Sequence, residues 1–232
     1  MDGIIQWWND LVSTFTKCFI REDRYMLLLD GIGVTIKISL LAVVIGIIIG
    51  LLIALCNLSP KKPLNVFGKI YTDIIRGTPS VTQLMIIYFV VFATVDWEKW
   101  IIAAIAFGIN SGAYVSEIIR AGILSIDKGQ NEAGRSLGLN GAQTMAYIVI
   151  PQAVKNIFPA LCNEFIVLIK ETAIVGYIGL VDIQKAGDFI KSATFEAFMP
   201  LIATAIIYFV LIKLLTLLMT RIEVSLRKSE QR

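Results

Sequence analysis

The sequence predicts an all-α membrane protein of five transmembrane helices, with the N-terminus outside the cell and the C-terminus in the cytoplasm. Three observations favour this fold class: an apolar composition, long uncharged stretches and an uneven distribution of basic residues. Hydrophobic residues make up 56% of the 232 residues, and charged residues make up only 17%, against about 25% in a soluble domain. A soluble domain could not bury this much apolar surface, so we expect a single membrane domain over 1–232.

A helix that crosses the membrane needs about 20 residues. Uncharged stretches of about this length mark the predicted spans. Residues 38–60, 77–95 and 100–116 carry no charged side chain, and another uncharged run covers 197–212. The segment 151–180 is also apolar, but four charged residues interrupt it. We therefore predict spans over 28–57, 78–95, 99–121, 151–178 and 197–219.

The orientation follows from the distribution of charge between the connections. An odd number of spans places the two termini on opposite sides. Lys and Arg are concentrated in 58–77, in 121–150 and after 219, whereas most acidic residues lie in the other connections and near the N-terminus. The positive-inside rule places the basic connections in the cytoplasm. We therefore expect 121–150 to be cytoplasmic and 179–196 to face outward.

The N-terminal residues 1–27 are predicted to be an outer interfacial segment. Their first ten residues lack the basic start and the long apolar core of a signal peptide. An amphipathic helix that carries Trp7 and Trp8 is typical of the membrane–water interface. We therefore expect this helix to lie at the depth of the lipid headgroups.

Two local patterns concern the ends and the packing of the spans. Thr78 directly before Pro79 predicts a threonine cap at the start of the second span. Gly46 and Gly50 are four residues apart in the first span, a spacing that lets a second helix approach closely.

The residues that are absent exclude several kinds of chemistry. The chain has no histidine, which removes Ser-His and Cys-His nucleophile pairs as well as histidine metal sites. Its three cysteines form no C-x-x-C pair, and no G-x-x-x-x-G-K-[ST] nucleotide-binding loop is present. We expect a protein that is not an enzyme, with no catalytic residue, metal or cofactor of its own and no nucleic-acid partner.

The connection 121–150 has the sequence pattern of two short helices joined by a glycine. Asp127 can cap the first helix, and Gly138 can end it in the left-handed conformation. Asn140 and Gln143 have the spacing of a capping box for the next helix. The pattern predicts a compact polar elbow that could fit a cleft on a soluble partner, although a purely structural elbow has the same pattern.

The elbow carries a motif that resembles the signature of permease subunits of bacterial ABC importers, E-A-A-x3-G-x9-I-x-L-P. Glu132, Ala133, Gly138, Ile148 and Pro151 match it, whereas glycine at 134 replaces the second alanine and isoleucine at 150 replaces the leucine. Further segments resemble the polar amino acid branch of that family: GVTIKISL (33–40), RGTPSVTQL (76–84), GAYVSEIIRAGILSIDKGQ (112–130), LGLNGAQ (137–143) and PQAVKNIFPALCNEFIVLIKETAI (151–174).

The resemblance implies a multi-pass protein of the bacterial cytoplasmic (inner) membrane that forms the path for a polar amino acid. A basic amino acid or glutamine is the favoured substrate. The implied partners are two cytoplasmic ABC ATPase subunits that bind ATP and Mg²⁺, an amino-acid-binding protein outside, and a second permease subunit. A homodimer is favoured over a heterodimer with a related permease, since one chain carries both a complete elbow and a polar face. The residues implied to couple to the ATPase are Glu132, Ala133, Gly134 and Gly138, with Ile148 and Pro151 fixing the link to the fourth span.

Polar residues within the predicted spans point to a translocation path, because a charge in hydrocarbon costs at least about 2.5–3.5 kcal/mol. We expect Glu117 and Arg120, three residues apart, to form a structural ion pair. Lys170 and Glu171 are predicted to hold an outer gate. The predicted path residues are Asn110, Tyr114, Asn163 and Glu164. Hydrogen bonding between subunits, without substrate contact, is the alternative role for these four.

Two other functions fit parts of the pattern. A permease for ions, sugars or peptides would carry the same elbow, and only the further matching segments favour amino acids. An ion channel would need a filter loop or a ring of charges, and neither is evident in the sequence.

Overall fold

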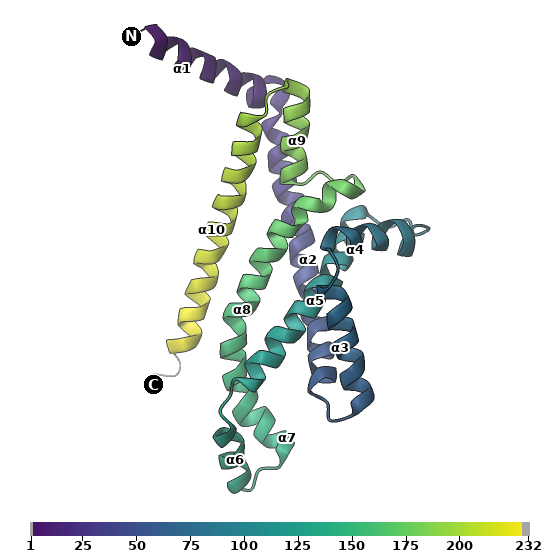
Figure 1. Cartoon of the computed structure of the whole chain (residues 1–232). Helices are drawn as coiled ribbons and strands as arrows, with labels where there is room; N and C mark the ends of the chain where they lie inside the picture. The colour runs from purple at the N-terminus through teal and green to yellow at the C-terminus, as the bar shows by residue number, and fades with distance from the viewer. Residues whose placement is uncertain (1, 229–232) are drawn as a thin grey trace.

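The computed structural model describes the backbone of residues 2–228 and the side chains of residues 3–225, and every regular element in this part of the chain is helical (Figure 1). In chain order the elements are α1 (Asp2–Phe15), η1 (Thr16–Ile20), η2 (Arg21–Asp23), α2 (Tyr25–Leu58), α3 (Lys62–Arg76), α4 (Ser80–Ile86), η3 (Ile87–Val91), α5 (Lys99–Leu124), α6 (Lys128–Ser136), α7 (Gly141–Thr144), η4 (Met145–Val149), α8 (Ile150–Glu171), η5 (Thr172–Ile178), α9 (Ile183–Thr194) and α10 (Phe198–Lys228).

Three of these helices are long and apolar enough to cross a membrane within the described residues. They are α2, α5 and α10, and they cover the predicted spans 28–57, 99–121 and 197–219. The fourth predicted span, 151–178, corresponds to α8 and η5. Its 22-residue helix is about 33 Å long, but it carries four charges. The total of five spans stays a prediction.

The second predicted span, 78–95, is wrong as a single straight helix. The helix there is formed by α4 and η3, whose 7 and 5 residues together extend only about 18 Å, short of the about 30 Å of hydrocarbon. It meets α3 at 103°. Pro79 explains the break, because proline disfavours a helical conformation in the residue before it. The predicted cap is also wrong: Thr78 donates its hydroxyl to the Ile74 carbonyl, 2.9 Å away, and makes no cap bond to α4.

Residues 62–76, which the charge pattern assigns to a cytoplasmic connection, form the helix α3 instead. This helix packs against α2 and α5. The Asn65 amide donates to the Asn57 carbonyl at 2.5 Å, and the Tyr71 hydroxyl donates to the Ile109 carbonyl at 2.6 Å. The bent pair of α3 and α4 can therefore count as one broken span.

The centre of the bundle is the packing of α2 against α5, and small residues make it possible. A Cβ atom on Gly50 would lie 2.5 Å from Val115 Cγ1, and one on Gly46 would lie 3.0 Å from Ser111 Oγ. Neither helix could approach so closely with a larger residue, which confirms the packing predicted from these two glycines. The buried residues around this pair are Ile38, Ala42, Leu84, Ala103, Ala104, Ala106, Phe107, Leu168, Val175 and Ile178.

A buried aspartate joins three helices at the other end of α2. Asp182 caps α9 by accepting from the backbone N–H groups of Gln184 and Lys185, at 3.2 and 2.9 Å. The hydroxyl of Tyr208 on α10 donates to the same carboxylate at 2.9 Å. The Asp182 backbone rests on Gly31 of α2, where a Cβ would lie 2.7 Å away. The connection that carries α9 is thus fixed to both α2 and α10.

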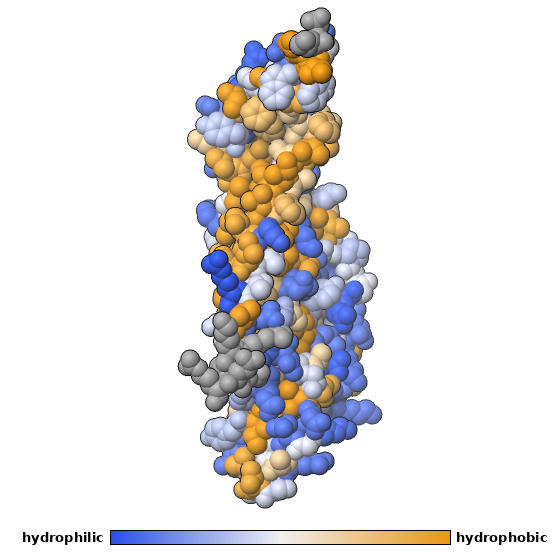
Figure 2. Space-filling view, turned by 90° about the vertical axis from the view of Figure 1, so that its left-hand side faces the viewer, coloured by the Kyte–Doolittle hydropathy of each residue, from blue (hydrophilic) through white to orange (hydrophobic). Residues whose placement is uncertain are grey.

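The bundle is elongated, with α1 at one end and the elbow of α6 and α7 at the other (Figure 1). Figure 2 looks at the α10 side and shows a mostly hydrophobic surface on the upper half and mostly hydrophilic residues on the lower part. Little of α10 is buried, so its exposed apolar surface needs lipid or another subunit to cover it. The side of the membrane on which each end lies stays a prediction.

Candidate functional site

The elbow has the local structure that its sequence predicts. The Asp127 carboxylate caps α6 by accepting from the Gly129 N–H at 2.6 Å. Gly138 adopts a φ of 86°, the left-handed region in which glycine carries no steric penalty. Asn140 and Gln143 form a complete capping box, each side chain accepting from the other's backbone N–H at 2.9 Å. The structure thus confirms these three predictions. They could be made from the sequence because each depends only on residues that are close in the chain.

The glycine that departs from the motif lies where the two helices of the elbow touch. A Cβ on Gly134 would lie 2.7 Å from Thr144 Cγ2 and 2.8 Å from Ile148 Cδ1. Thr144 is fully buried. Glycine at this position therefore lets α6 pack tightly on α7 and η4, and Ile148 forms part of that contact.

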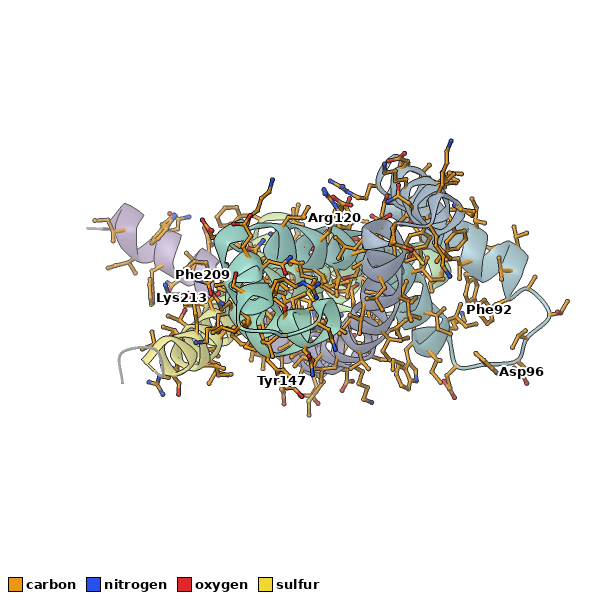
Figure 3. All side chains as sticks on the ribbon, turned by 90° about the horizontal axis from the view of Figure 1, so that it is seen from below. Phe92, Asp96, Arg120, Tyr147, Phe209 and Lys213 are labelled. Carbon is orange, nitrogen blue, oxygen red and sulfur yellow. The ribbon has the colours of Figure 1, made fainter. Side chains whose placement is uncertain are left out.

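The outer surface of the elbow presents the remaining motif residues to solvent. Glu132, Ala133 and Gly138 are all exposed. Beside them, 81% of Leu137 is exposed, a large fraction for an apolar side chain at the tip of a polar loop. Tyr147 on η4 is 72% exposed and lies at one edge of the bundle, opposite the edge where Arg120 lies (Figure 3).

The elbow is tied directly to α8. The elements α7, η4 and α8 follow one another without a break, and Pro151 lies in the first turn of α8. Gln152 donates to Gln130 Oε1 at 3.2 Å, and Asn156 donates to Ser125 Oγ at 3.0 Å. The sequence pattern does not predict these two amide contacts, because a lone amide residue carries no pattern that indicates its partner.

The four predicted path residues are divided between different environments. Glu164 is buried and accepts from Ser111 Oγ on α5 at 2.8 Å. Asn110 is buried and donates to Gln83 Oε1 at 2.9 Å. Tyr114 is half-buried and Asn163 is exposed. The structure thus brings Asn110 and Tyr114 to the turn between α3 and α4, brings Glu164 against α5, and leaves Asn163 apart from the other three.

The other predicted charged residues lie towards the ends of their helices. Arg120 and Glu117 form the predicted ion pair, with Nη2 and Oε2 2.8 Å apart. Lys170 is exposed and Glu171 is half-buried at the end of α8. Glu171 interacts electrostatically with both Lys170 and Glu164. Their role as a gate stays a prediction.

A polar cluster that was not predicted from the sequence lies at the turn between α3 and α4. Gln83 donates to the carbonyls of Ile75 and Thr78, at 2.7 and 3.1 Å, and to the Thr78 hydroxyl at 2.7 Å. The Arg76 guanidinium lies over the Tyr114 ring, 5.4 Å from its centroid. The sequence contains one signal for this cluster: the charged residues along 62–76 recur with the period of a helix.

Comparison with known proteins identifies the family. Residues 46–228 match the model of the binding-protein-dependent transport system inner membrane component. The chain is 42% identical over 204 residues to the putative glutamine transport system permease protein GlnP of Rickettsia bellii (strain RML369-C), covering 87% of this chain and 94% of that relative. It is 42% identical over 205 residues to the arginine transport system permease protein ArtQ of Bacillus subtilis (strain 168), covering 88% and 94%.

Solved structures agree with the sequence relatives. A chain from the crystal structure of an amino acid ABC transporter with histidines has a TM-score of 0.81 and 45% identity, covering 88% of this chain and 97% of that one. A chain of the MetNI methionine ABC transporter has a TM-score of 0.75 at 20% identity, which shows a shared fold alone. The chain therefore belongs to the family of binding-protein-dependent transport system inner membrane components and is a multi-pass inner membrane transport subunit, not an enzyme.

Proposed function

We propose that this chain forms the translocation path for a polar amino acid, glutamine or a basic one, and couples that path to cytoplasmic ABC ATPases through the elbow. The names of the relatives support the substrate class, since they include glutamine and arginine permeases. ATP and Mg²⁺ would be bound by the ATPase subunits, because this chain has no nucleotide-binding loop.

One observation carries the coupling proposal: a continuous helical segment links the elbow to a buried acid. It runs from Gly141 through η4 and α8 to Glu171 and carries Glu164 on its buried side. Coupling between two sites requires an element whose state both sites influence. A movement of the exposed elbow would be transmitted along this segment to the position of Glu164.

The chemistry of Glu164 supports a role in binding a cationic group. A carboxylate in a low-dielectric environment interacts strongly with an ammonium or guanidinium, and every amino acid carries an ammonium. Asn110, Tyr114 and Asn163 would supply polar groups along the same route, and Lys170 and Glu171 would control its outer end. The proposal gives Glu117 and Arg120 only a structural role.

The assembly that we propose has two permease subunits, two ATPases and an amino-acid-binding protein outside the cell. Two copies of this chain would form the membrane core. Lipid or another protein subunit would cover the exposed apolar surface of α10 in this assembly. Residues 1–27 would lie at the outer membrane–water interface, which the exposed Trp7 and Trp8 on α1 support.

The coupling role is tested by replacing Gly138 with valine. A β-branched residue at φ 86° costs about 1–2 kcal/mol, which would distort the tip of the elbow where it meets the ATPase. We expect amino acid uptake and substrate-stimulated ATP hydrolysis to fall together in proteoliposomes. The matched control is Gly141→Val, because Gly141 has an ordinary φ and no atom within 4 Å of the added Cβ.

Normal uptake and normal ATP hydrolysis in a correctly inserted Gly138→Val variant would contradict the coupling role. A panel of labelled amino acids, ions and sugars measured on the same wild-type complex tests the substrate class. Uptake of an ion or a sugar, with no amino acid transported, would favour one of the alternative permease functions.

A further inference from the structure

The helix α3 carries a polar stripe that extends into the membrane domain. Lys62, Lys69, Asp73 and Arg76 are separated by seven, four and three residues, so they share one side of the helix. All four side chains are exposed. Among the described residues, none of the four forms an ion pair. The side of α3 next to this stripe packs against α2 and α5 through Gly68, Tyr71 and Thr72.

The last residue of this stripe, Arg76, lies near the middle of the bundle. From Lys62 to Arg76 the helix rises about 21 Å, more than half of the about 30 Å of hydrocarbon. The contacts of α3 with α5 lie along the middle part of that helix. Tyr71 bonds to the carbonyl of Ile109 and Arg76 lies over Tyr114, both close to the centre of the 26-residue helix.

A guanidinium at this depth must face a polar environment. An arginine that faced lipid tails at the bilayer centre would cost several kcal/mol. The described contacts of the Arg76 guanidinium are the ring of Tyr114 and an electrostatic interaction with Glu117. Neither of these takes up its five N–H donors. The donors are therefore available to a ligand in a water-accessible path.

The surrounding residues hold Arg76 in position before any ligand arrives. Gln83 bonds the carbonyls of Ile75 and Thr78, which flank Arg76 and Gly77 on either side. Gln83 is itself held by the buried amide of Asn110. The backbone at Arg76 is therefore fixed between two helices, and the Tyr114 ring supports the guanidinium from one face.

We propose that Arg76 binds the α-carboxylate of the transported amino acid, an inference that rests on the proposed function. Guanidinium and carboxylate match as a planar pair with two parallel hydrogen bonds. A zwitterion that crosses a low-dielectric path needs a partner for each charge. Arg76 takes the carboxylate, and Glu164, bonded to Ser111 one turn from Tyr114 on α5, takes the cationic group.

The test compares an amino acid with its α-carboxamide, which lacks the negative charge and keeps the rest of the molecule. Binding of labelled glutamine, arginine and their α-carboxamides is measured on the purified permease–ATPase complex in nanodiscs, without the binding protein. For Arg76→Gln we expect amino acid affinity to fall about ten- to hundred-fold. Carboxamide affinity should fall by much less, because its neutral carbonyl can accept a hydrogen bond from the guanidinium but forms no bidentate ion pair with it.

Matched variants separate ligand contact from structure. Lys69→Gln removes another exposed cation from the same side of α3, about two turns before Arg76, and it should leave both affinities unchanged. Tyr114→Leu removes the ring that supports the guanidinium, so it should weaken binding of the amino acid more than Tyr114→Phe, which keeps the ring. If Arg76→Gln fails to assemble, Arg76→Lys replaces it and should reduce the preference for the amino acid over the carboxamide.

The possible outcomes distinguish this inference from the function on which it rests. Equal losses for amino acid and carboxamide in the Arg76 variant, or no loss for either, would show that Arg76 does not bind the carboxylate while amino acid binding stands. A wild-type complex that binds no amino acid would overturn the proposed function, and the inference with it.

Discussion

At the scale of single residues, the buried pair of Glu164 and Ser111 places an acid inside the bundle with one defined hydrogen bond. The hydroxyl of Ser111 donates to the carboxylate at 2.8 Å. A single neutral donor satisfies only part of the bonding capacity of a carboxylate. The remaining capacity is what a cationic group of the substrate would use.

Replacing Glu164 with glutamine tests this acid directly. Glutamine keeps the size and the acceptor for Ser111 but removes the charge, so we expect uptake of labelled amino acid to fall about ten-fold or more, equivalent to about 1.4 kcal/mol. Assembly with the ATPase should remain normal by co-purification. Ser111→Ala is the control, because it removes the hydrogen bond and keeps the charge. Unchanged transport across a panel of amino acids would remove Glu164 from the path.

The glycines of α2 give a second test at this scale. A methyl group on Gly50 would lie 2.5 Å from Val115, so we expect Gly50→Ala to destabilise the protein by about 1–3 kcal/mol. Gly33→Ala lies on the same helix with nothing within 4 Å and should be neutral or stabilising by up to about 1 kcal/mol. The apparent unfolding temperature of each purified variant measures the difference. Equal unfolding temperatures would show that α2 and α5 can separate without cost.

The sequence could predict those residues whose partners are near in the chain. Asp127, Gly138 and the Asn140–Gln143 capping box are local features, and each one forms as expected. Arg76 and Gln83 were not predicted, because their partners lie on α5, 38 and 27 residues further along the chain. A bend between helices brings these residues together, and no local pattern specifies the angle of that bend.

At the scale of elements, the turn between α3 and α4 is held by hydrogen bonds from the buried side chain of Gln83. Removing its amide with Gln83→Leu would leave the carbonyl of Ile75 and the amide of Asn110 without these partners. We expect a loss of about 1–3 kcal/mol in stability. Thr82→Val is the control, since Thr82 is the exposed neighbour of Gln83 on α4. Thermal unfolding followed by intrinsic fluorescence would measure both variants, and equal stability would mean that the bend does not depend on this side chain.

The same turn explains why the second span was predicted incorrectly. Hydropathy reports how apolar a segment is, and 77–95 carries no charge, but hydropathy contains no information on direction. In 62–76 the count of charges predicts a cytoplasmic connection, whereas the structure shows a helix that packs on α2 and α5, because a count of charged residues contains no information on their helical spacing. The helical spacing of those charges was the signal that distinguished the two.

At the scale of the whole molecule, the fold class follows from composition, but the surfaces between subunits do not. The apolar face of α10 and the polar stripe of α3 are both exposed in a single chain. Lipid would cover the first, and a water-accessible path would contact the second, so each surface specifies a different environment. A sequence pattern identifies an apolar or polar face, whereas the assembly determines what covers it.

The orientation in the membrane is tested by cysteine labelling of intact cells. In a variant with Cys18, Cys56 and Cys162 replaced by serine, we expect Trp97→Cys in the outer connection to react with a membrane-impermeant maleimide. Leu137→Cys at the tip of the elbow should react only after the cells are permeabilised. Lys61→Cys, in the connection between α2 and α3, should behave like position 137 but lies outside the elbow, so a bound ATPase would not be expected to mask it.

These positions are accessible in the chain, because Leu137, Trp97 and Lys61 are exposed. Labelling of position 137 or 61 from outside, with position 97 protected, would show that the orientation is the opposite of the predicted one. An elbow outside the cell could not contact a cytoplasmic ATPase, so the coupling role would then be wrong.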